Sequence, residues 1–145
     1  MPLASLLYIS HSLIGPSSPE MNRIAEIART RNAAADVTGF LYHDDATFLQ
    51  ALEGPEDALE AIFASIRDDT RHDRVRPLAR GLTDGRRFAG WSLGLFDGAP
   101  SSGLLRLAFG DGVVANVGEG DAPALLDFLG HLAEGREDEY RLRPA

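Results

Sequence analysis

The sequence predicts an α+β fold: a ferredoxin-like β-α-β-β-α-β-β sandwich with a mixed five-stranded sheet, two helices on one face and a C-terminal helical extension. Two observations predict it. Residues 3–10 alternate as a strand does and four further segments have the character of short strands, whereas two segments carry apolar residues at every third or fourth position, as helices do. The 145 residues allow one domain with its own core, but not two of ordinary size.

The first strand and the first helix have clear local signals. Residues 3–10 alternate in the manner of a strand, with Tyr8 among apolar neighbours. Ser18 followed by Pro19 is typical of a helix start, because serine caps the free backbone N–H groups and proline fits the first turn. A helix is therefore expected over residues 19–33.

A hairpin and a second helix come next. Residues 37–43 and 47–53 are apolar runs separated by an acidic turn, which indicates two strands joined by a hairpin. Gly-Pro then ends the second strand. From Leu59 to Ile66 the apolar residues follow the spacing i, i+3, i+4, i+7, so this segment is expected to be an amphipathic helix.

Two more strands and a tail complete the chain. Residues 71–82 and 91–96 are expected to be the last strands. The tail, residues 98–145, begins with a linker rich in Pro, Ser and Gly at 99–103 and contains an amphipathic helix at 122–133. Because both earlier helices cover one sheet face, the opposite apolar face needs cover, and the tail helix is expected to dock there or on a partner.

Composition narrows the function classes. The net charge is −8 without a dense basic segment, which argues against direct binding of nucleic acid. The absence of cysteine removes disulfides and thiol catalysis. His11, His43, His72 and His131 lack zinc-type spacing, so no metal site is expected. With neither a secretory signal nor an apolar run of ~20 residues, we expect a cytoplasmic protein without a membrane partner.

Three hydrogen-bonding side chains stand at the centres of apolar strands: Tyr8, Gln50 and Trp91. A buried amide without a partner costs about 1–3 kcal/mol. Counting by twos places Gln50 with Phe48 on one strand face and Trp91 with Leu93 on one face of another. If Tyr8 shares that face, the three converge beneath the helices, where they satisfy one another in an ordinary core or bind a ligand.

A series of short motifs stands in order between residues 6 and 97. They are Tyr8, Arg31-Asn32, Asp36-Val37-Thr38-Gly39-Phe40-Leu41, Phe48-Leu49-Gln50-Ala51-Leu52-Glu53-Gly54-Pro55, Arg71-His72 and Arg87-Phe88-Ala89-Gly90-Trp91-Ser92-Leu93-Gly94. In this order they resemble the BLUF domain, the flavin-binding sensor of blue light. The resemblance implies a BLUF domain over residues 1–97 and an extension over 98–145.

The resemblance also implies a site. A non-covalent flavin, FAD first and FMN or riboflavin as alternatives, would lie between the two helices. Gln50 would bridge the Tyr8 phenol and the flavin N5/O4 edge, and Asn32 would hold the neighbouring edge. The other implied residues are apolar walls (Ile24, Ala28, Leu41, Phe48), groups near the phosphate or ring margin (Arg31, Arg71, His72) and the last strand (Trp91, Leu93).

The implied activity is photochemical rather than enzymatic. Tyr8 would pass an electron and a proton to the excited flavin, and the hydrogen bonds of Gln50 would rearrange; no substrate is turned over. The signal would pass through the last strand to the C-terminal helices and on to a separate signalling protein or a second copy of the chain. Leu93 stands where many relatives have methionine, which is expected to alter how that strand responds.

Two alternatives from other classes stay open, since similar folds carry unrelated functions. One is a small acylphosphatase-like hydrolase that uses Ser10-His11 with Arg31 and Asn32. The other is an interaction module without flavin, in which residues 125–132 form a dimer face. A yellow purified protein would argue against both.

Overall fold

One mixed sheet organises the computed structural model, which describes residues 2–16, 18–98, 104–135 and 141–142. The elements in chain order are β1 (Leu3–Ser12), α1 (Pro19–Ala34), β2 (Thr38–His43), β3 (Thr47–Pro55), α2 (Glu56–Arg67), β4 (His72–Leu82), β5 (Leu93–Asp97), α3 (Leu104–Phe109), α4 (Val113–Asn116), the 3₁₀ turn η1 (Glu119–Asp121), α5 (Ala122–Gly135) and β6 (Arg141–Leu142). The predicted linker at 99–103 lies outside the described residues.

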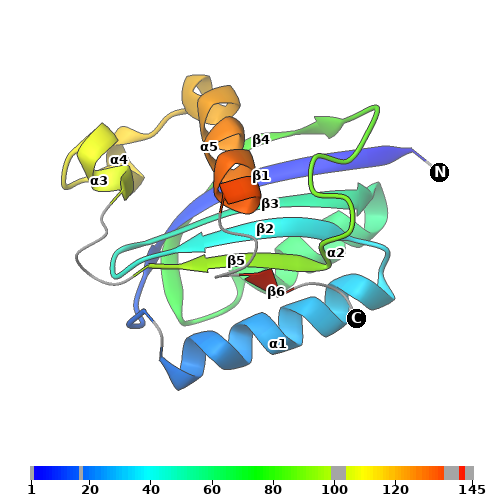
Figure 1. The fold of residues 1–145 in the computed structure, drawn as a ribbon, viewed down its shortest axis with the longest axis horizontal. Coiled ribbons are helices and arrows are strands. Elements are labelled where there is room, and N and C mark those ends of the chain that lie inside the picture. Colours follow the sequence, from blue (N-terminus) through cyan, green and yellow to red (C-terminus); the bar gives the residue numbers. More distant parts are fainter. Residues whose placement is uncertain (1, 17, 99–103, 136–140, 143–145) are drawn as a thin grey trace.

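The strand order in the sheet is β4-β1-β3-β2-β5-β6 (Figure 1). Neighbouring strands are antiparallel except β2 and β5, which are parallel. The first four strands have the ferredoxin-like order, and β5 adds to the free edge of β2, so the predicted α+β architecture is confirmed. The short strand β6, which pairs with β5, was not predicted, because two residues are too few to show a periodic pattern.

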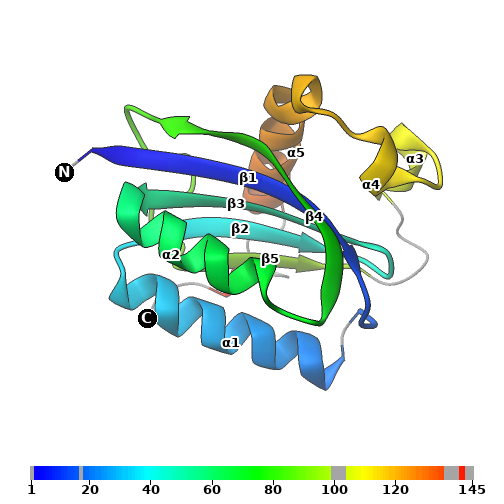
Figure 2. The same cartoon turned by 180° about the vertical axis from the view of Figure 1, so that it is seen from behind.

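Helices α1 and α2 lie side by side on one face of the sheet (Figure 2). The predicted start of α1 is confirmed: the Ser18 side chain accepts a hydrogen bond from the Met21 backbone N–H at 3.1 Å. The buried face of α1 includes two alanines, Ala25 and Ala28, whereas α2 buries the large apolar side chains of Leu59 and Phe63. The two helices therefore bound the space above the middle strands with buried side chains of different size.

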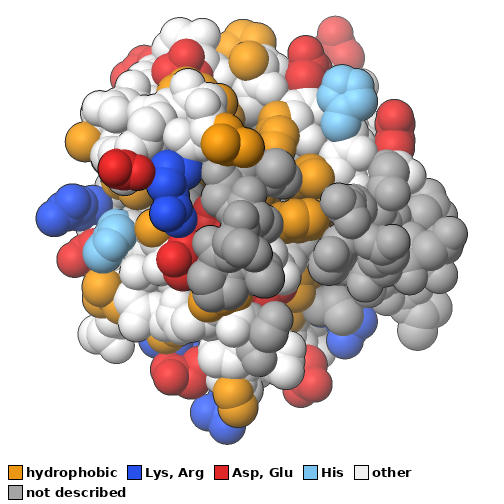
Figure 3. Space-filling view, turned by 60° about the vertical axis from the view of Figure 1, so that its left-hand side comes forward, with side chains coloured by type: hydrophobic (Ala, Val, Ile, Leu, Met, Phe, Trp, Pro, Cys, Tyr) orange, Lys and Arg blue, Asp and Glu red, His pale blue; other side chains and the backbone are white. Residues whose placement is uncertain are grey.

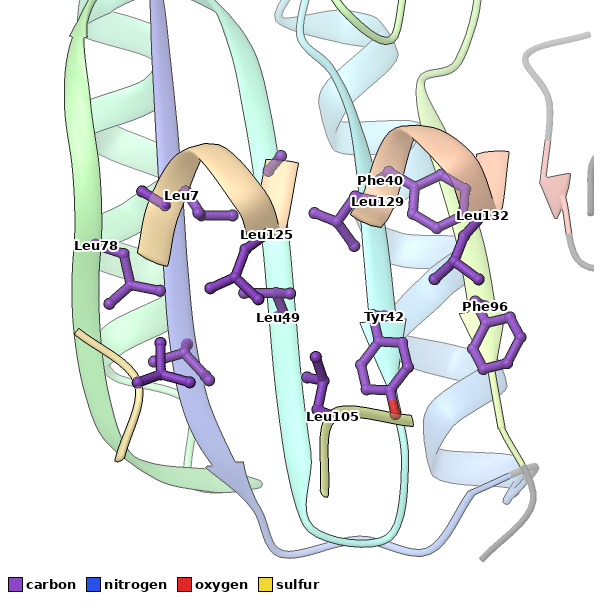
Figure 4. Packing of buried hydrophobic residues seen from close by; sticks show 14 of the residues in the cluster. Leu7, Phe40, Tyr42, Leu49, Leu78, Phe96, Leu105, Leu125, Leu129 and Leu132 are labelled. Carbon is purple, nitrogen blue, oxygen red and sulfur yellow. The ribbon is translucent and has the colours of Figure 1, made fainter. Parts of the chain in front are cut away.

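The C-terminal region covers the opposite face of the sheet. Helix α5 crosses that face (Figure 1), and its leucines lie over apolar side chains of the sheet (Figure 4). Leu125, Leu129 and Leu132 are buried there in one cluster with Leu49 and Phe40. The expectation that the tail helix docks on the sheet is confirmed. Because these leucines are already buried, residues 125–132 do not offer a free dimer face.

A buried carboxylate fixes the connection between β4 and β5. Glu53, at the end of β3, accepts hydrogen bonds from the backbone N–H of Arg87 at 2.6 Å and of Phe88 at 2.9 Å, and from the Thr38 hydroxyl at 3.2 Å. Buried carboxylates are tolerated when their oxygens are hydrogen-bonded in this way. Glu53 therefore holds the loop that leads from β4 to Trp91.

Trp91 does not share a face with Leu93, so this prediction is wrong. The last strand begins at Leu93 rather than at residue 91. Trp91 packs edge-on against Phe40, with ring centroids 6.1 Å apart, in the cluster on the α5 side. Leu93 lies in the cluster beneath α1. Period-two counting fails here because Gly90, with φ of 87°, turns the chain just before the strand.

Candidate functional site

A cavity of about 140 Å³ lies between α1 and α2 and reaches down to the sheet. Its lining consists of Tyr8, Ile24, Ile27, Ala28, Arg31, Leu41, Phe48, Gln50, Ser65, Ile66, Asp69, Arg71 and His72. All the residues predicted to bind a flavin are among them except Asn32 and Leu93, and Trp91 lies elsewhere. Four lining residues were not predicted from the sequence: Ile27, Ser65, Ile66 and Asp69.

Two cross-strand partners form the polar floor of the cavity. Tyr8 on β1 stands directly opposite Gln50 on β3, and the Tyr8 hydroxyl donates to Gln50 Oε1 at 2.7 Å. Both side chains are 3% exposed. Burial raises the pKa of the Tyr8 phenol well above its usual range, while the positive charge of Arg31 opposes this rise. Tyr8 is therefore a neutral hydrogen-bond donor in the resting protein.

Only one of the two polar atoms of the Gln50 amide has a hydrogen-bond partner among the described residues. Its oxygen accepts from Tyr8, and its nitrogen has no hydrogen-bond partner among the residues that the structure describes. Because Gln50 lines the cavity, this nitrogen is available to an acceptor placed there. An amide donor beside a phenol–amide hydrogen bond is the feature that an ordinary, self-satisfied core would lack.

The walls of the cavity are apolar and come from four elements. Ile24 and Ala28 project from α1, Leu41 from β2, Phe48 from β3 and Ile66 from α2. Flat aromatic ligands bury most of their surface against such side chains and leave their polar edge to a few placed donors. A flavin ring fits this donor set, since its N5/O4 edge offers acceptors that match the free Gln50 nitrogen.

His72 ties one wall of the cavity to the sheet. Its Nε2 lies 2.6 Å from the Ile66 carbonyl oxygen, and its Nδ1 lies 2.7 Å from Ser10 Oγ. Because a carbonyl only accepts, Nε2 donates, and in the neutral ring Nδ1 accepts the Ser10 hydroxyl. The neighbouring His11 contacts Asp73 instead. Ser10 and His11 thus have separate structural partners and do not assemble as a nucleophile and its base.

Asn32 lies behind the cavity wall. Its Nδ2 donates to the Ser92 carbonyl at 2.8 Å, and its Oδ1 accepts from Arg31 Nε and Nη2, both at 3.3 Å. The residue is fully buried and joins the end of α1 to the segment just before β5. Its predicted contact with the flavin edge stays a prediction, as does any contact of Leu93.

Charged groups gather at the mouth of the cavity. Asp69 accepts from Arg71 Nε at 2.9 Å and from Arg71 Nη2 at 2.6 Å. These hydrogen bonds hold the pKa of Asp69 below its usual range and raise the pKa of Arg71. Arg31 has no carboxylate partner among the described residues, and burial lowers its pKa. Arg31 thus contributes an unpaired positive charge near the phenol of Tyr8.

Charged side chains of both signs lie on one face of the molecule (Figure 3). On the face seen in Figure 3, basic and acidic side chains are interspersed with apolar ones. Within the described part of the chain, every helix is too short or too polar to span a bilayer. The same residues contain no cluster of three or more His, Asp or Glu arranged to hold a metal ion.

Several known proteins are similar to this chain. It is 35% identical over 95 residues to the blue light- and temperature-regulated antirepressor BluF of Escherichia coli strain K12, covering 66% of this chain and 24% of the relative. It is 36% identical over 94 residues to photoactivated adenylate cyclase subunit beta of Euglena gracilis, covering 63% and 11%. The chain therefore spans a quarter or less of these curated relatives.

Solved structures agree with the sequence relatives. The dark-state structure of the BLUF protein BlrB superposes with a TM-score of 0.71 at 26% identity, covering 89% of this chain and 96% of BlrB. Klebsiella pneumoniae BlrP1 superposes with a TM-score of 0.64 at 28% identity, covering 92% of this chain and 33% of BlrP1. The profile of the family described as sensors of blue light using FAD matches residues 3–94. The chain belongs to the BLUF family of blue-light sensors.

Proposed function

We propose that this chain senses blue light through a flavin bound in the cavity between α1 and α2, and that Tyr8 and Gln50 are the light-responsive pair. The observation that carries the proposal is the Gln50 amide, which accepts from Tyr8 and leaves its nitrogen free at the cavity. FAD is the proposed flavin because the family description names it. FMN and riboflavin are the alternatives.

The flavin, when bound, supplies an electron acceptor that blue light excites. Tyr8 is the proposed donor of the electron and the proton. Burial raises its pKa, so the phenol keeps its proton in the resting protein. Gln50 lies on the proton's path because its oxygen already holds the Tyr8 hydrogen. Rotation or tautomerisation of the amide would then exchange donor and acceptor at the same place.

The proposed output runs from β5 into the C-terminal region. Phe96 of β5 stacks on Tyr42 of β2 at 5.4 Å between ring centroids, and Phe128 of α5 meets the same ring at 5.5 Å. A shift of β5 would therefore change the surface on which α5 packs. On this proposal residues 1–97 form the sensor, residues 98–145 carry the output, and Trp91 acts from the α5 side.

The receiver of the signal is proposed to be a separate protein or a second copy of the chain, in the cytoplasm. The sensor itself turns over no substrate. One observation supports a signalling role: part of photoactivated adenylate cyclase subunit beta of Euglena gracilis is similar to this chain. A partner screen with the flavin-loaded protein in dark and light would identify the receiver, and fractionation of the source cells would test the location.

Visible absorption tests the proposal. The purified protein and its Tyr8→Phe and Tyr42→Phe variants are measured in the dark and directly after blue light. Tyr42 is the matched control, because its buried hydroxyl donates to Asp44 on the other side of the sheet. We expect a reversible red shift of the flavin bands in wild type and Tyr42→Phe, and none in Tyr8→Phe. A protein that refuses added flavin, or a full shift in Tyr8→Phe, would refute the proposal.

A further inference from the structure

An acidic residue, Asp69, lines the cavity between α1 and α2 at a partly exposed position. Tyr8 and Gln50 form the closed end of the cavity, whereas the side chains of Asp69 and Arg71 are 29% and 32% exposed and lie at its open end. A ring bound against the floor would extend its ribityl chain outward past such a mouth. Asp69 and Arg71 are thus placed to meet the part of a flavin that differs between riboflavin and FMN.

Arg71 is already engaged at that mouth. Its guanidinium donates from Nε and Nη2 to the two oxygens of Asp69, at 2.9 and 2.6 Å, and its backbone N–H donates to Asp69 at 2.9 Å. This two-pronged geometry is the one that a guanidinium uses for a phosphate. A phosphate can take the place of the carboxylate only by breaking the pair and meeting the repulsion of the Asp69 charge.

The surrounding charges do not cancel this effect. Glu20 on α1 adds a second negative charge near Arg71, and it acts in the same direction as Asp69. Arg31 is the remaining cation of the lining, and its guanidinium turns toward Asn32. His72 faces Asp69 from β4 but is held between the Ser10 hydroxyl and the Ile66 carbonyl.

We propose that Asp69 sets how strongly this site prefers phosphorylated flavins, because it occupies the guanidinium of Arg71 that would otherwise bind the phosphate. The inference rests on the proposed function, namely that the cavity binds a flavin. It assigns Asp69 as a specificity-determining residue. In wild type the phosphate therefore adds little to the binding affinity, and the site distinguishes poorly between riboflavin and FMN.

The test compares riboflavin with FMN, which differ only by the phosphate. Flavin-free protein is titrated with each, and flavin fluorescence gives the two dissociation constants. Asp69→Asn keeps the side-chain shape but removes the charge, and should raise the preference for FMN over riboflavin by about tenfold, as expected for one charge-assisted hydrogen bond. Added salt should reduce that gain, because the mouth is partly exposed.

Two further variants test whether the change in FMN preference comes from the Asp69–Arg71 ion pair. Asp68→Asn removes the same charge from the neighbouring residue, which does not line the cavity, and should leave the preference unchanged. Adding Arg71→Gln to Asp69→Asn should abolish the gain. An unchanged FMN preference in Asp69→Asn, with normal riboflavin binding, would overturn the inference about Asp69 alone. Failure of wild type to bind either flavin would overturn the proposed function.

Discussion

Removing the Tyr8 hydroxyl should destabilise the protein through Gln50 rather than through packing. In Tyr8→Phe the ring keeps its contacts with Phe63 and His72, but Gln50 Oε1 loses the donor that lies 2.7 Å away. A buried acceptor without a partner costs about 1–3 kcal/mol. Because the cavity lets water reach Gln50, we expect the low end, about 1 kcal/mol.

A double-mutant cycle separates the hydrogen bond from the packing. Gln50→Leu alone leaves the Tyr8 hydroxyl without its acceptor and should also lower the free energy of unfolding by about 1 kcal/mol. The double variant Tyr8→Phe/Gln50→Leu has neither unpaired group, so its loss should be smaller than the sum of the single losses by about 1 kcal/mol. The free energies come from urea unfolding of flavin-free protein in the dark.

The control cycle pairs Gln50→Leu with Tyr42→Phe. Tyr42 lies in the cluster on the opposite side of the sheet, and its hydroxyl donates to Asp44 at 2.6 Å rather than to Gln50. Its losses should add within about 0.5 kcal/mol. If the Tyr8 cycle is equally additive, the Tyr8–Gln50 hydrogen bond contributes nothing to the resting structure, and the reasoning about the cavity floor is refuted.

Three further perturbations test the fold and the cavity mouth. Gly39→Ala places a Cβ 2.2 Å from a backbone carbonyl oxygen of β3, so urea unfolding should show a loss of unfolding free energy of at least about 1–3 kcal/mol. The control Gly81→Ala, with nothing within 4 Å of the added Cβ, should lose much less. Equal losses in the two variants would contradict the packing of β2 against β3. Leu129→Ala, at a position that is 0% exposed, should lower the free energy of unfolding by about 2–5 kcal/mol. The control Leu107→Ala, at 85% exposure, should change it by no more than about 0.5 kcal/mol. An unchanged stability in Leu129→Ala would contradict the packing of α5 in the core. The folded pKa of Asp69 lies below the unfolded value of 3.8, so its carboxylate adds stability above that pH and loses it as the pH falls through the folded pKa. Asp69→Asn should therefore differ from wild type most above pH 4 and least in strong acid, and a pH-independent difference in unfolding free energy would contradict the ion pair.

The sequence could predict those features that follow from short repeats and local caps. The period of two in a strand dictates that Tyr8 and Gln50 each lie on one face with apolar neighbours, and the antiparallel pairing of β1 with β3 brings them opposite each other. The Ser18 cap marks the start of α1. The apolar stripe of the tail helix predicted burial, and the uncovered sheet face predicted where it would be buried.

The remaining features depend on tertiary geometry that no local pattern carries. Trp91 was assigned to the wrong face because the turn at Gly90 interrupts the alternation before β5 begins. Asp69 lies just after α2 in a segment that reads as a polar helix end, and only the approach of α1 makes it part of a cavity. Asn32 resembles a ligand-binding residue in sequence, yet the structure connects it to Ser92.

The central claim is that light changes the hydrogen bonds of Gln50, and the composition allows a direct test. Gln50 is the only glutamine in the chain, so ¹⁵N in the glutamine side chain labels a single amide, whose assignment is checked by its loss in Gln50→Ala. Nuclear magnetic resonance spectra are recorded on the flavin-loaded protein in the dark, under blue light and after recovery. We predict that the side-chain amide resonances move in the light and return in the dark. Resonances that stay in place while the flavin absorption shifts would contradict the account.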